Sequence, residues 1–154
     1  MAFQITSRAF KNGEAIPAHY TADGEDVSPP LEWKESPAGT KAFALVCDDP
    51  DAASGNFTHW IIFNIPTTVV HLPEAYPALR TQPNGIQQGL NDFGGLGYQG
   101  PKPPSGIHRY FFKLYALGAP LDLEGDVKKP VFERAAQRRL LGTAELMGTY
   151  ERKK

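Results

Sequence analysis

Two histidines and one acidic run are the residues of this sequence whose types could do chemistry together. His59 and His108 each lie on a strand-like segment near a tight loop, and Asp48-Asp49-Pro50-Asp51 follows another such segment. Imidazole N–H groups can donate hydrogen bonds to an anion, and a carboxylate that touches the ring favours its charged form. Taken singly, each histidine is more often a hydrogen-bonded structural residue, so the pattern alone leaves both interpretations open.

Strand alternation predicts which residues share a face with each histidine. Residues two apart point to the same side of a strand. The first face then consists of Phe57, His59, Ile61 and Phe63, and the second of His108, Tyr110, Phe112 and Leu114. A polar group at the end of an apolar face is what the mouth of a small pocket requires. If Asp49 touches either ring, anion binding should weaken as the pH rises above the histidine pKa.

Two other motifs predict no chemistry. The run from Gly95 to Gly100 matches the dinucleotide pattern G-x-G-x-x-G. That pattern needs a helix directly after the glycines, and Pro101-Lys102-Pro103-Pro104 cannot supply one. An EF-hand loop that began at Asp49 would place Ser54 where glycine is required and Trp60 where glutamate is required, which excludes calcium binding of that type.

Strands and ordered loops are the elements expected to position these side chains. The chain has 154 residues, of which 41% are hydrophobic and 21% charged, so we expect a single domain over residues 1–154. Fifteen glycines and fourteen prolines argue against a helical bundle. Strands are predicted over residues 42–46, 57–65 and 108–117, with weaker candidates over residues 4–7 and 85–90. Strands without interleaved helices predict a mainly β fold of two packed antiparallel sheets.

The C-terminal end has the one helical period in the sequence. Apolar residues recur at three- and four-residue steps from Phe132 to Met147. Gly142 interrupts this stretch, so we expect two short helices or one kinked helix there.

Charge and targeting signals exclude several classes of partner. The formal charge is −1, which disfavours both a nucleic-acid-binding protein and electrostatic docking to anionic membranes. No stretch approaches the ~18 apolar residues of a membrane span, and the N-terminus lacks the apolar core of a signal peptide. We therefore expect a cytoplasmic protein. The basic run Arg152-Lys153-Lys154 is expected to be a solvated tail, and Cys47, the only cysteine, a buried apolar residue.

Four blocks of the sequence together resemble the phosphatidylethanolamine-binding protein family. They are Asp26-Val27-Ser28-Pro29-Pro30-Leu31-Glu32-Trp33; Asp49-Pro50-Asp51 with His59-Trp60 and Asn64; Gly100-Pro101 with Pro104, Gly106 and His108-Arg109-Tyr110; and Gly148-Thr149-Tyr150-Glu151-Arg152. The blocks come in family order. The likeness is closest to the short bacterial branch that is often called Raf kinase inhibitor-like proteins.

The resemblance implies a β-sandwich with Greek-key topology, short C-terminal helices and a pocket for a small anion. Matched residue by residue, the pocket would be lined by Asp49, His59, the Gly100-Pro101 backbone, His108 and Tyr110, and Tyr150 would close it. Asp51, Trp60 and Arg109 would support the pocket. The family usually has a proline, associated with a cis bond, where this chain has Ala53. Alanine rarely sustains a cis bond, because the cis form costs about 2.5–4 kcal/mol.

Two functions from different classes remain in view. The first is a non-enzymatic protein that binds a phospholipid headgroup or another small phosphorylated or anionic molecule, with no cofactor. By analogy alone, a protein kinase is a candidate partner and a homodimer a candidate assembly. The second is a hydrolase of esters or phosphoesters that uses His59, His108 and Asp49, either around a metal or with a histidine as general base. The absence of a recognisable nucleophile motif favours binding, with no catalytic residue and no metal.

Overall fold

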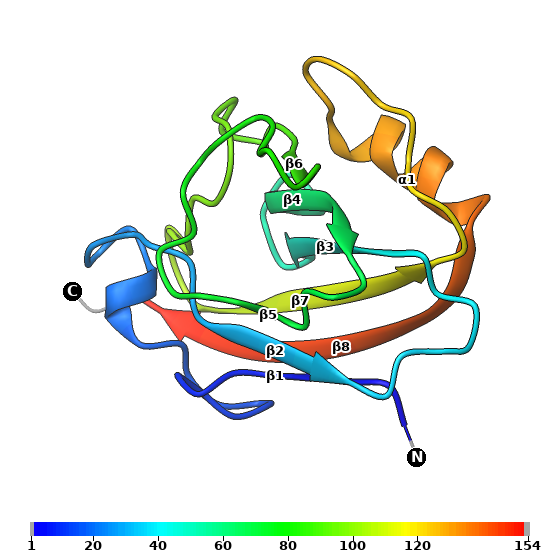
Figure 1. Cartoon of the computed structure of the whole chain (residues 1–154). Helices are drawn as coiled ribbons and strands as arrows, with labels where there is room; N and C mark the ends of the chain where they lie inside the picture. The colour runs from blue at the N-terminus through cyan, green and yellow to red at the C-terminus, as the bar shows by residue number, and fades with distance from the viewer. Residues whose placement is uncertain (1, 153–154) are drawn as a thin grey trace.

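The computed structural model describes residues 2–152, and in that range it consists of two antiparallel β-sheets, one short 3₁₀-helix and one α-helix (Figure 1). The smaller sheet contains β1 (Gln4–Thr6), β2 (Leu31–Lys34) and β5 (His71–Leu72), in the order β1-β2-β5. The larger sheet has the order β6-β4-β3-β7-β8 and contains β6 (Gln87–Gln88), β4 (Phe57–Pro66), β3 (Ala42–Asp49), β7 (Ile107–Leu117) and β8 (Leu140–Glu151). The helices are η1 (Ala18–Tyr20) and α1 (Lys129–Gln137).

The larger sheet has Greek-key topology. Strands β3, β4, β6 and β7 come in this order along the chain, with β5 of the smaller sheet between β4 and β6, and they lie side by side as β7-β3-β4-β6. The fourth of these strands returns beside the first, which is the arrangement that defines a Greek key. The predicted fold class, a mainly β sandwich of two antiparallel sheets, is therefore confirmed.

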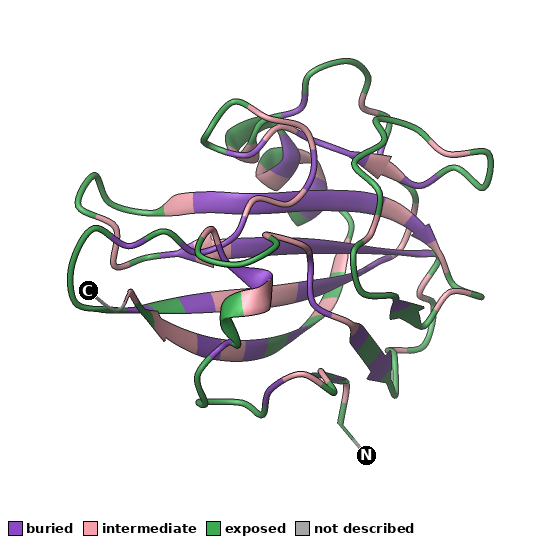
Figure 2. Cartoon of the chain, turned by 90° about the vertical axis from the view of Figure 1, so that its left-hand side faces the viewer, coloured by how far each residue is buried: buried purple, intermediate pink, exposed green. Residues whose placement is uncertain are grey.

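The central strands of the larger sheet are buried along most of their length (Figure 2). The two faces of β3 contact different hydrophobic clusters. Phe43, Leu45 and Cys47 pack toward the smaller sheet, where Trp33 of β2 lies against Phe43 with 5.6 Å between ring centroids. On the opposite face, the residues between them pack under α1 with Phe132. A strand covered on both sides needs no polar alternation, which explains the continuous apolar run in the sequence.

The predicted helix over residues 132–147 is half wrong. Its first part forms α1, but residues 140–151 form β8, which pairs antiparallel with β7 along most of its length. Ala144, Leu146 and Gly148 are buried at every second position of β8. This strand period of two competes with the helical period in the same residues. The segment forms a strand because it pairs with the edge of β7, which would otherwise be open.

Several smaller predictions can also be compared with the structure. Strands β1, β3, β4 and β7 lie where they were expected, whereas the candidate over residues 85–90 shrinks to β6, and β2 and β5 were not predicted. Cys47 is buried, and burial raises the pKa of its thiol. Of the predicted basic tail, Arg152 donates to Asp23 at 2.7 Å, while residues 153 and 154 lie outside the described range. Across residues 2–152, the helices are too short or too polar to cross a membrane.

Candidate functional site

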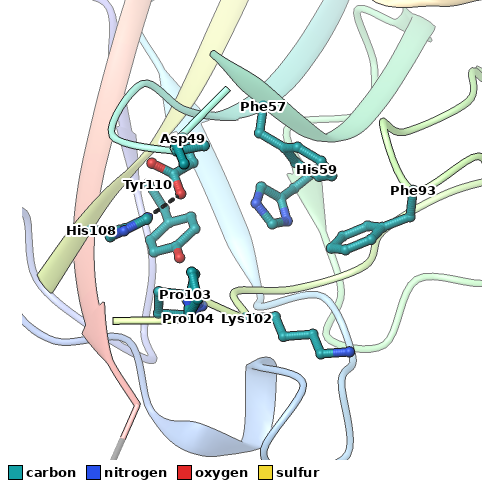
Figure 3. Close-up of a pocket in the computed structure, with 11 residues that line it drawn as sticks. Asp49, Phe57, His59, Phe93, Lys102, Pro103, Pro104, His108 and Tyr110 are labelled. Atoms are coloured by element: carbon teal, nitrogen blue, oxygen red, sulfur yellow. Dashed lines mark hydrogen bonds and ion pairs between the residues drawn. The ribbon is translucent and has the colours of Figure 1, made fainter. Parts of the chain in front are cut away.

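A cavity of about 160 Å³ lies at the edge of the larger sheet where β3 ends and β4 and β7 begin (Figure 3). Because β3 is antiparallel to both β4 and β7, the end of β3 lies beside the starts of the other two strands. The lining residues are Asp49, Ala52, Ala53, Phe57, His59, Phe93, Lys102, Pro103, Pro104, His108 and Tyr110. The structure thus brings together four of the predicted site residues, Asp49, His59, His108 and Tyr110.

A β-bulge at the start of β4 aims His59 into this cavity. Opposite β4, Cys47 pairs with Trp60 and Asp48 pairs with Thr58, so His59 is an extra residue without a partner on β3. Residues that pair across an antiparallel ladder point to the same side, so Thr58 shares the face of Asp48, and His59 points the other way with Asp49. Bulges of this kind commonly redirect a side chain beside a functional site.

The bulge corrects one predicted face and leaves the other intact. Strict alternation placed His59 with Ile61 and Phe63, but those two residues pack under α1 in the opposite cluster. On β7 the alternation holds, because Tyr110 shares the inner face with Phe112 and Leu114, and His108 opens into the cavity from the same strand end.

His59 presents a hydrogen-bond acceptor to the cavity. Its Nδ1 lies 2.7 Å from the carbonyl oxygen of Gln99. A carbonyl oxygen can only accept, so Nδ1 carries the hydrogen and the lone pair of the neutral ring is on Nε2. Burial lowers the pKa of His59 despite the nearby Asp49 carboxylate. The lowered pKa favours the neutral form of the His59 ring, and Asp49 contacts His108 instead.

Asp49 and His108 form a buried pair opposite His59. Asp49 Oδ2 lies 2.6 Å from Nδ1 of His108, and the other carboxylate oxygen accepts the Asp51 backbone N–H at 2.7 Å. Asp49 is 3% exposed and His108 8% exposed. The carboxylate orients the imidazole and leaves Nε2 of His108 as the ring atom available to a guest. Both histidines are buried.

Tyr110 supplies a hydroxyl that the described part of the chain does not satisfy. Its ring lies between those of His59 and His108, at 5.3 Å and 6.4 Å between centroids (Figure 3). The hydroxyl is buried and makes no hydrogen bond of normal distance and angle with residues 2–152, and the Asp49 carboxylate acts on it only from outside that geometry. Burial, with the charge of Asp49 adding to it, raises the pKa of Tyr110, so the hydroxyl stays protonated. An unpaired buried donor is costly, and a bound acceptor would relieve that cost.

The three predicted support residues contact the elements that carry the cavity without lining it. Asp51 accepts from the backbone N–H and Nε of Arg109, both at 2.9 Å, and from Nη2 at 2.8 Å. This bidentate pair joins the turn after β3 to the first residues of β7, and the hydrogen bonds from Arg109 lower the pKa of Asp51 to about 2. Trp60 is fully buried and donates from Nε1 to Gln88 at 2.8 Å.

Three of the predicted ligand-binding residues do not line the cavity. The Gly100 N–H donates to Asp26 at 2.7 Å, and Pro101 has no N–H to offer. Tyr150 pairs with His108 across the β7–β8 ladder, but its hydroxyl donates to Asp23 at 2.7 Å. Their resemblance-based assignment as direct contacts is therefore not matched by the geometry.

Sequence reasoning missed the walls of the cavity. Phe57 and Phe93 form an aromatic pair on one side, with ring centroids 4.7 Å apart. Lys102, Pro103 and Pro104 cover another side. The run of prolines was a signal for this wall, because it predicts a stiff extended segment. At the rim lies Ala53, and residues 2–152 contain no cis peptide bond, as the alanine led us to expect.

A metal centre finds no geometric support in the described residues. No three side chains of the histidine, cysteine, aspartate or glutamate type in residues 2–152 are grouped so that they could share an ion. Asp51 is held by Arg109.

Comparisons with known proteins agree on the family. Residues 6–151 match the family model described as phosphatidylethanolamine-binding protein. A UPF0098 protein of Methanothermobacter thermautotrophicus is 50% identical over 148 residues, which cover 96% of this chain and 98% of that protein. The crystal structure of the homolog CT736 from Chlamydia trachomatis has a TM-score of 0.90 at 38% identity and covers 99% of both chains. YbcL of E. coli has a TM-score of 0.91 at 34% identity and covers 99% of this chain and 100% of its own.

Proposed function

The chain belongs to the phosphatidylethanolamine-binding protein family, and on that basis we propose that it is a binding protein whose cavity holds a small anion such as phosphate or a phosphorylated group. The cavity of about 160 Å³ is smaller than the roughly 300–1,000 Å³ of sites for drug-sized ligands. Its size therefore favours a guest, or a headgroup, of few atoms.

The observation that carries this proposal is the unpaired hydroxyl of Tyr110. It lines the cavity, it is buried, and it forms no hydrogen bond with the described residues. Beside it, His108 lines the same cavity, and Asp49 contacts its Nδ1 and leaves its Nε2 out of that contact. The hydroxyl donates, and Nε2 of His108 donates as well when the ring is the imidazolium that a carboxylate partner favours, so the two groups suit an oxyanion, whose oxygens accept several hydrogen bonds at once.

Isothermal titration calorimetry with inorganic phosphate tests the proposal. We expect the wild-type protein to bind phosphate, and we expect Tyr110→Phe and His108→Gln each to weaken binding by about tenfold or more, because each removes one hydrogen bond to a charged group. His71→Gln is the matched control, because His71 is exposed on β5 and should leave affinity unchanged. Wild-type protein that binds no phosphate, or a His108→Gln protein that binds it normally, would contradict the proposal.

Hydrolysis is the second candidate, and one observation favours it. The neutral His59, with its lone pair on Nε2, has the form that a general base requires. A panel of ester and phosphoester substrates tests this candidate. Turnover that disappears in both His59→Gln and His108→Gln would support a hydrolase, whereas turnover that survives either change would come from another source.

A further inference from the structure

The hydrogen-bonding pattern of the cavity is mixed, and this narrows the guest it can accept. The donor is the hydroxyl of Tyr110, and His108, whose Nδ1 lies against Asp49, adds a second donor from Nε2 when its ring is the imidazolium. The acceptor is Nε2 of His59, because Gln99 holds the hydrogen of that ring on Nδ1. A guest that satisfies all three groups must accept hydrogen bonds and also donate one.

We propose that the cavity selects oxyanions that carry an acidic proton, such as hydrogen phosphate and phosphomonoester monoanions, over oxyanions of similar shape that carry none. This inference rests on the proposed function, because it assumes that an anion binds in the cavity. It adds a chemical criterion that shape and charge alone do not give. Sulfate, which is fully ionised at neutral pH, and phosphodiesters have no such proton to offer.

The charges around His59 favour a singly charged guest as well. Asp49 on β3 lines the cavity and is buried, so its carboxylate opposes a second negative charge on the guest. Lys102 is the one lysine or arginine among the lining residues in the described range. The titratable groups that face or influence His59 are Asp49 and Asp48 on β3, His108 and Tyr110 on β7, Lys102 in the loop and Asp26 after η1.

The aromatic rings around His59 make it unfavourable for its Nε2 to lack a hydrogen-bond donor in the complex. His59 is 3% exposed, and Phe57, Phe93 and Tyr110 pack around its ring. Little water can reach Nε2 once a guest fills the space, so an oxygen without a proton would face the nitrogen lone pair directly. A buried polar group that loses its partner in this way destabilises the complex by about 1–3 kcal/mol, which corresponds to roughly tenfold to a hundredfold in affinity.

Calorimetric titration of the wild-type protein with four probes tests the selection. At about pH 6.5, methyl phosphate keeps part of its population as the protonated monoanion, since the second pKa of phosphomonoesters is near 6. We expect inorganic phosphate and methyl phosphate to bind. Sulfate, a dianion without a proton, and dimethyl phosphate, a monoanion without a proton, should bind at least about tenfold more weakly.

The outcomes separate this inference from the proposed function. If no probe binds, the proposed function fails. If sulfate or dimethyl phosphate binds as tightly as methyl phosphate, the proposed function stands and the selection is wrong. Glycerophosphoethanolamine serves as the lipid-headgroup arm. Because its phosphate is a diester, we expect it to bind more weakly than phosphoethanolamine, the monoester with the same ammonium group, and equal or tighter binding would overturn the selection.

A variant and a proton balance identify His59 as the selecting group. The amide of His59→Gln can turn its NH₂ toward the guest, so the affinity ratio of phosphate to sulfate should fall toward one, while His71→Gln leaves the ratio unchanged. Wild-type protein should also take up a proton when it binds methyl phosphate at about pH 8, where the free monoester is mostly the dianion without a proton. Titrations in two buffers of different ionisation enthalpy measure that uptake without a variant, and zero uptake would overturn the proposal.

Discussion

Asp48 and Asp49 are neighbours at the end of β3, yet they lie on opposite faces of the larger sheet in opposite situations. Asp48 accepts from Thr58 Oγ1 at 2.8 Å and from Lys129 Nζ at 2.6 Å, under α1. Asp49 pairs with His108 and borders the cavity. The first carboxylate is neutralised by a lysine, whereas the second is held by a histidine whose other nitrogen remains available.

The two tyrosines of β7 repeat this contrast. Tyr115 donates its hydroxyl to Glu133 of α1 at 2.9 Å. Tyr110, on the other face, has no partner in residues 2–152. Burial raises the pKa of both hydroxyls, with Glu133 adding to the effect at Tyr115 and Asp49 at Tyr110, so both stay protonated.

The comparison distinguishes polar groups that stabilise the fold from polar groups whose hydrogen-bonding positions remain open to a ligand. We call Asp48, Thr58, Tyr115, Lys129 and Glu133 the helix-side cluster, and Asp49, His59, His108 and Tyr110 the cavity-side cluster. In the helix-side cluster these side chains pair with one another. In the cavity-side cluster, donors and an acceptor stay open. Substitutions in the first cluster should therefore change stability, and those in the second should change binding.

Lys129→Met gives the largest expected change in stability. The side chains of Lys129 and Asp48 are 21% and 18% exposed, so Asp48 would keep a half-buried charge without its partner. We expect the free energy of unfolding to fall by about 1–3 kcal/mol, measured by urea denaturation, with unchanged phosphate affinity. Lys128→Met, at the exposed neighbour, is the matched control. Altered phosphate affinity in Lys129→Met would show that the two faces are coupled and would break the comparison.

Tyr110→Phe and Tyr115→Phe form a matched pair with a smaller effect. Tyr115→Phe removes the hydrogen bond to Glu133, so the free energy of unfolding should fall by about 1 kcal/mol. Tyr110→Phe removes a hydroxyl that the fold does not satisfy, so stability should stay level or rise by up to about 1 kcal/mol, while phosphate affinity falls. Thermal unfolding of both variants, with and without phosphate, measures this. Destabilisation by Tyr110→Phe equal to that by Tyr115→Phe would mean that the cavity hydroxyl has a structural partner.

The sequence was sufficient for the long strands β3, β4 and β7 and for the meeting of the two histidines. Residues 57–65 and 108–117 carry their β signal in their own composition, and the turns that flank them are local features. Once β4 and β7 both lie beside β3, their starting ends fall at one edge, next to Asp49. Local chemistry and simple topology therefore predict most of the cavity-side cluster.

The features that the sequence did not predict depend on contacts between distant parts of the chain. The bulge at His59 arises from the register of β4 against β3, which composition does not encode. Strand β8 exists because β7 offers an edge to pair with, and this overrides the helical period of residues 140–147. The Gly100 N–H is used by Asp26, a residue 74 positions away. Such long-range pairings are where propensity and periodicity lose their predictive value.

The ion pair of Asp51 and Arg109 should give the smallest change in the free energy of unfolding. It lies next to the cavity without lining it, so it tests where the binding site ends. The hydrogen bonds from Arg109 lower the pKa of Asp51 to about 2, below the ordinary 3.8. The unfolded chain therefore binds a proton at higher pH than the folded chain, so the stabilisation is complete above about pH 4 and is lost as the pH falls toward 2. The side chains are 28% and 51% exposed, so solvent screening should limit the contribution to about 0.2–1 kcal/mol.

Arg109→Gln should therefore be less stable than wild type at about pH 6 and should approach it at about pH 2.5, as measured by urea unfolding at each pH. Arg8→Gln removes the exposed contact of Arg8 with Glu32, at 3.5 Å, and serves as the matched surface control without this pH dependence. The cavity-side cluster contains neither residue of the Asp51–Arg109 pair, so phosphate affinity should change less in Arg109→Gln than in His108→Gln. An equal loss of affinity would mean that the brace positions His108, because residue 109 follows it directly on β7. The functional site would then include residues outside the cavity-side cluster. The division between stabilising groups and binding groups would no longer follow the two faces of the larger sheet.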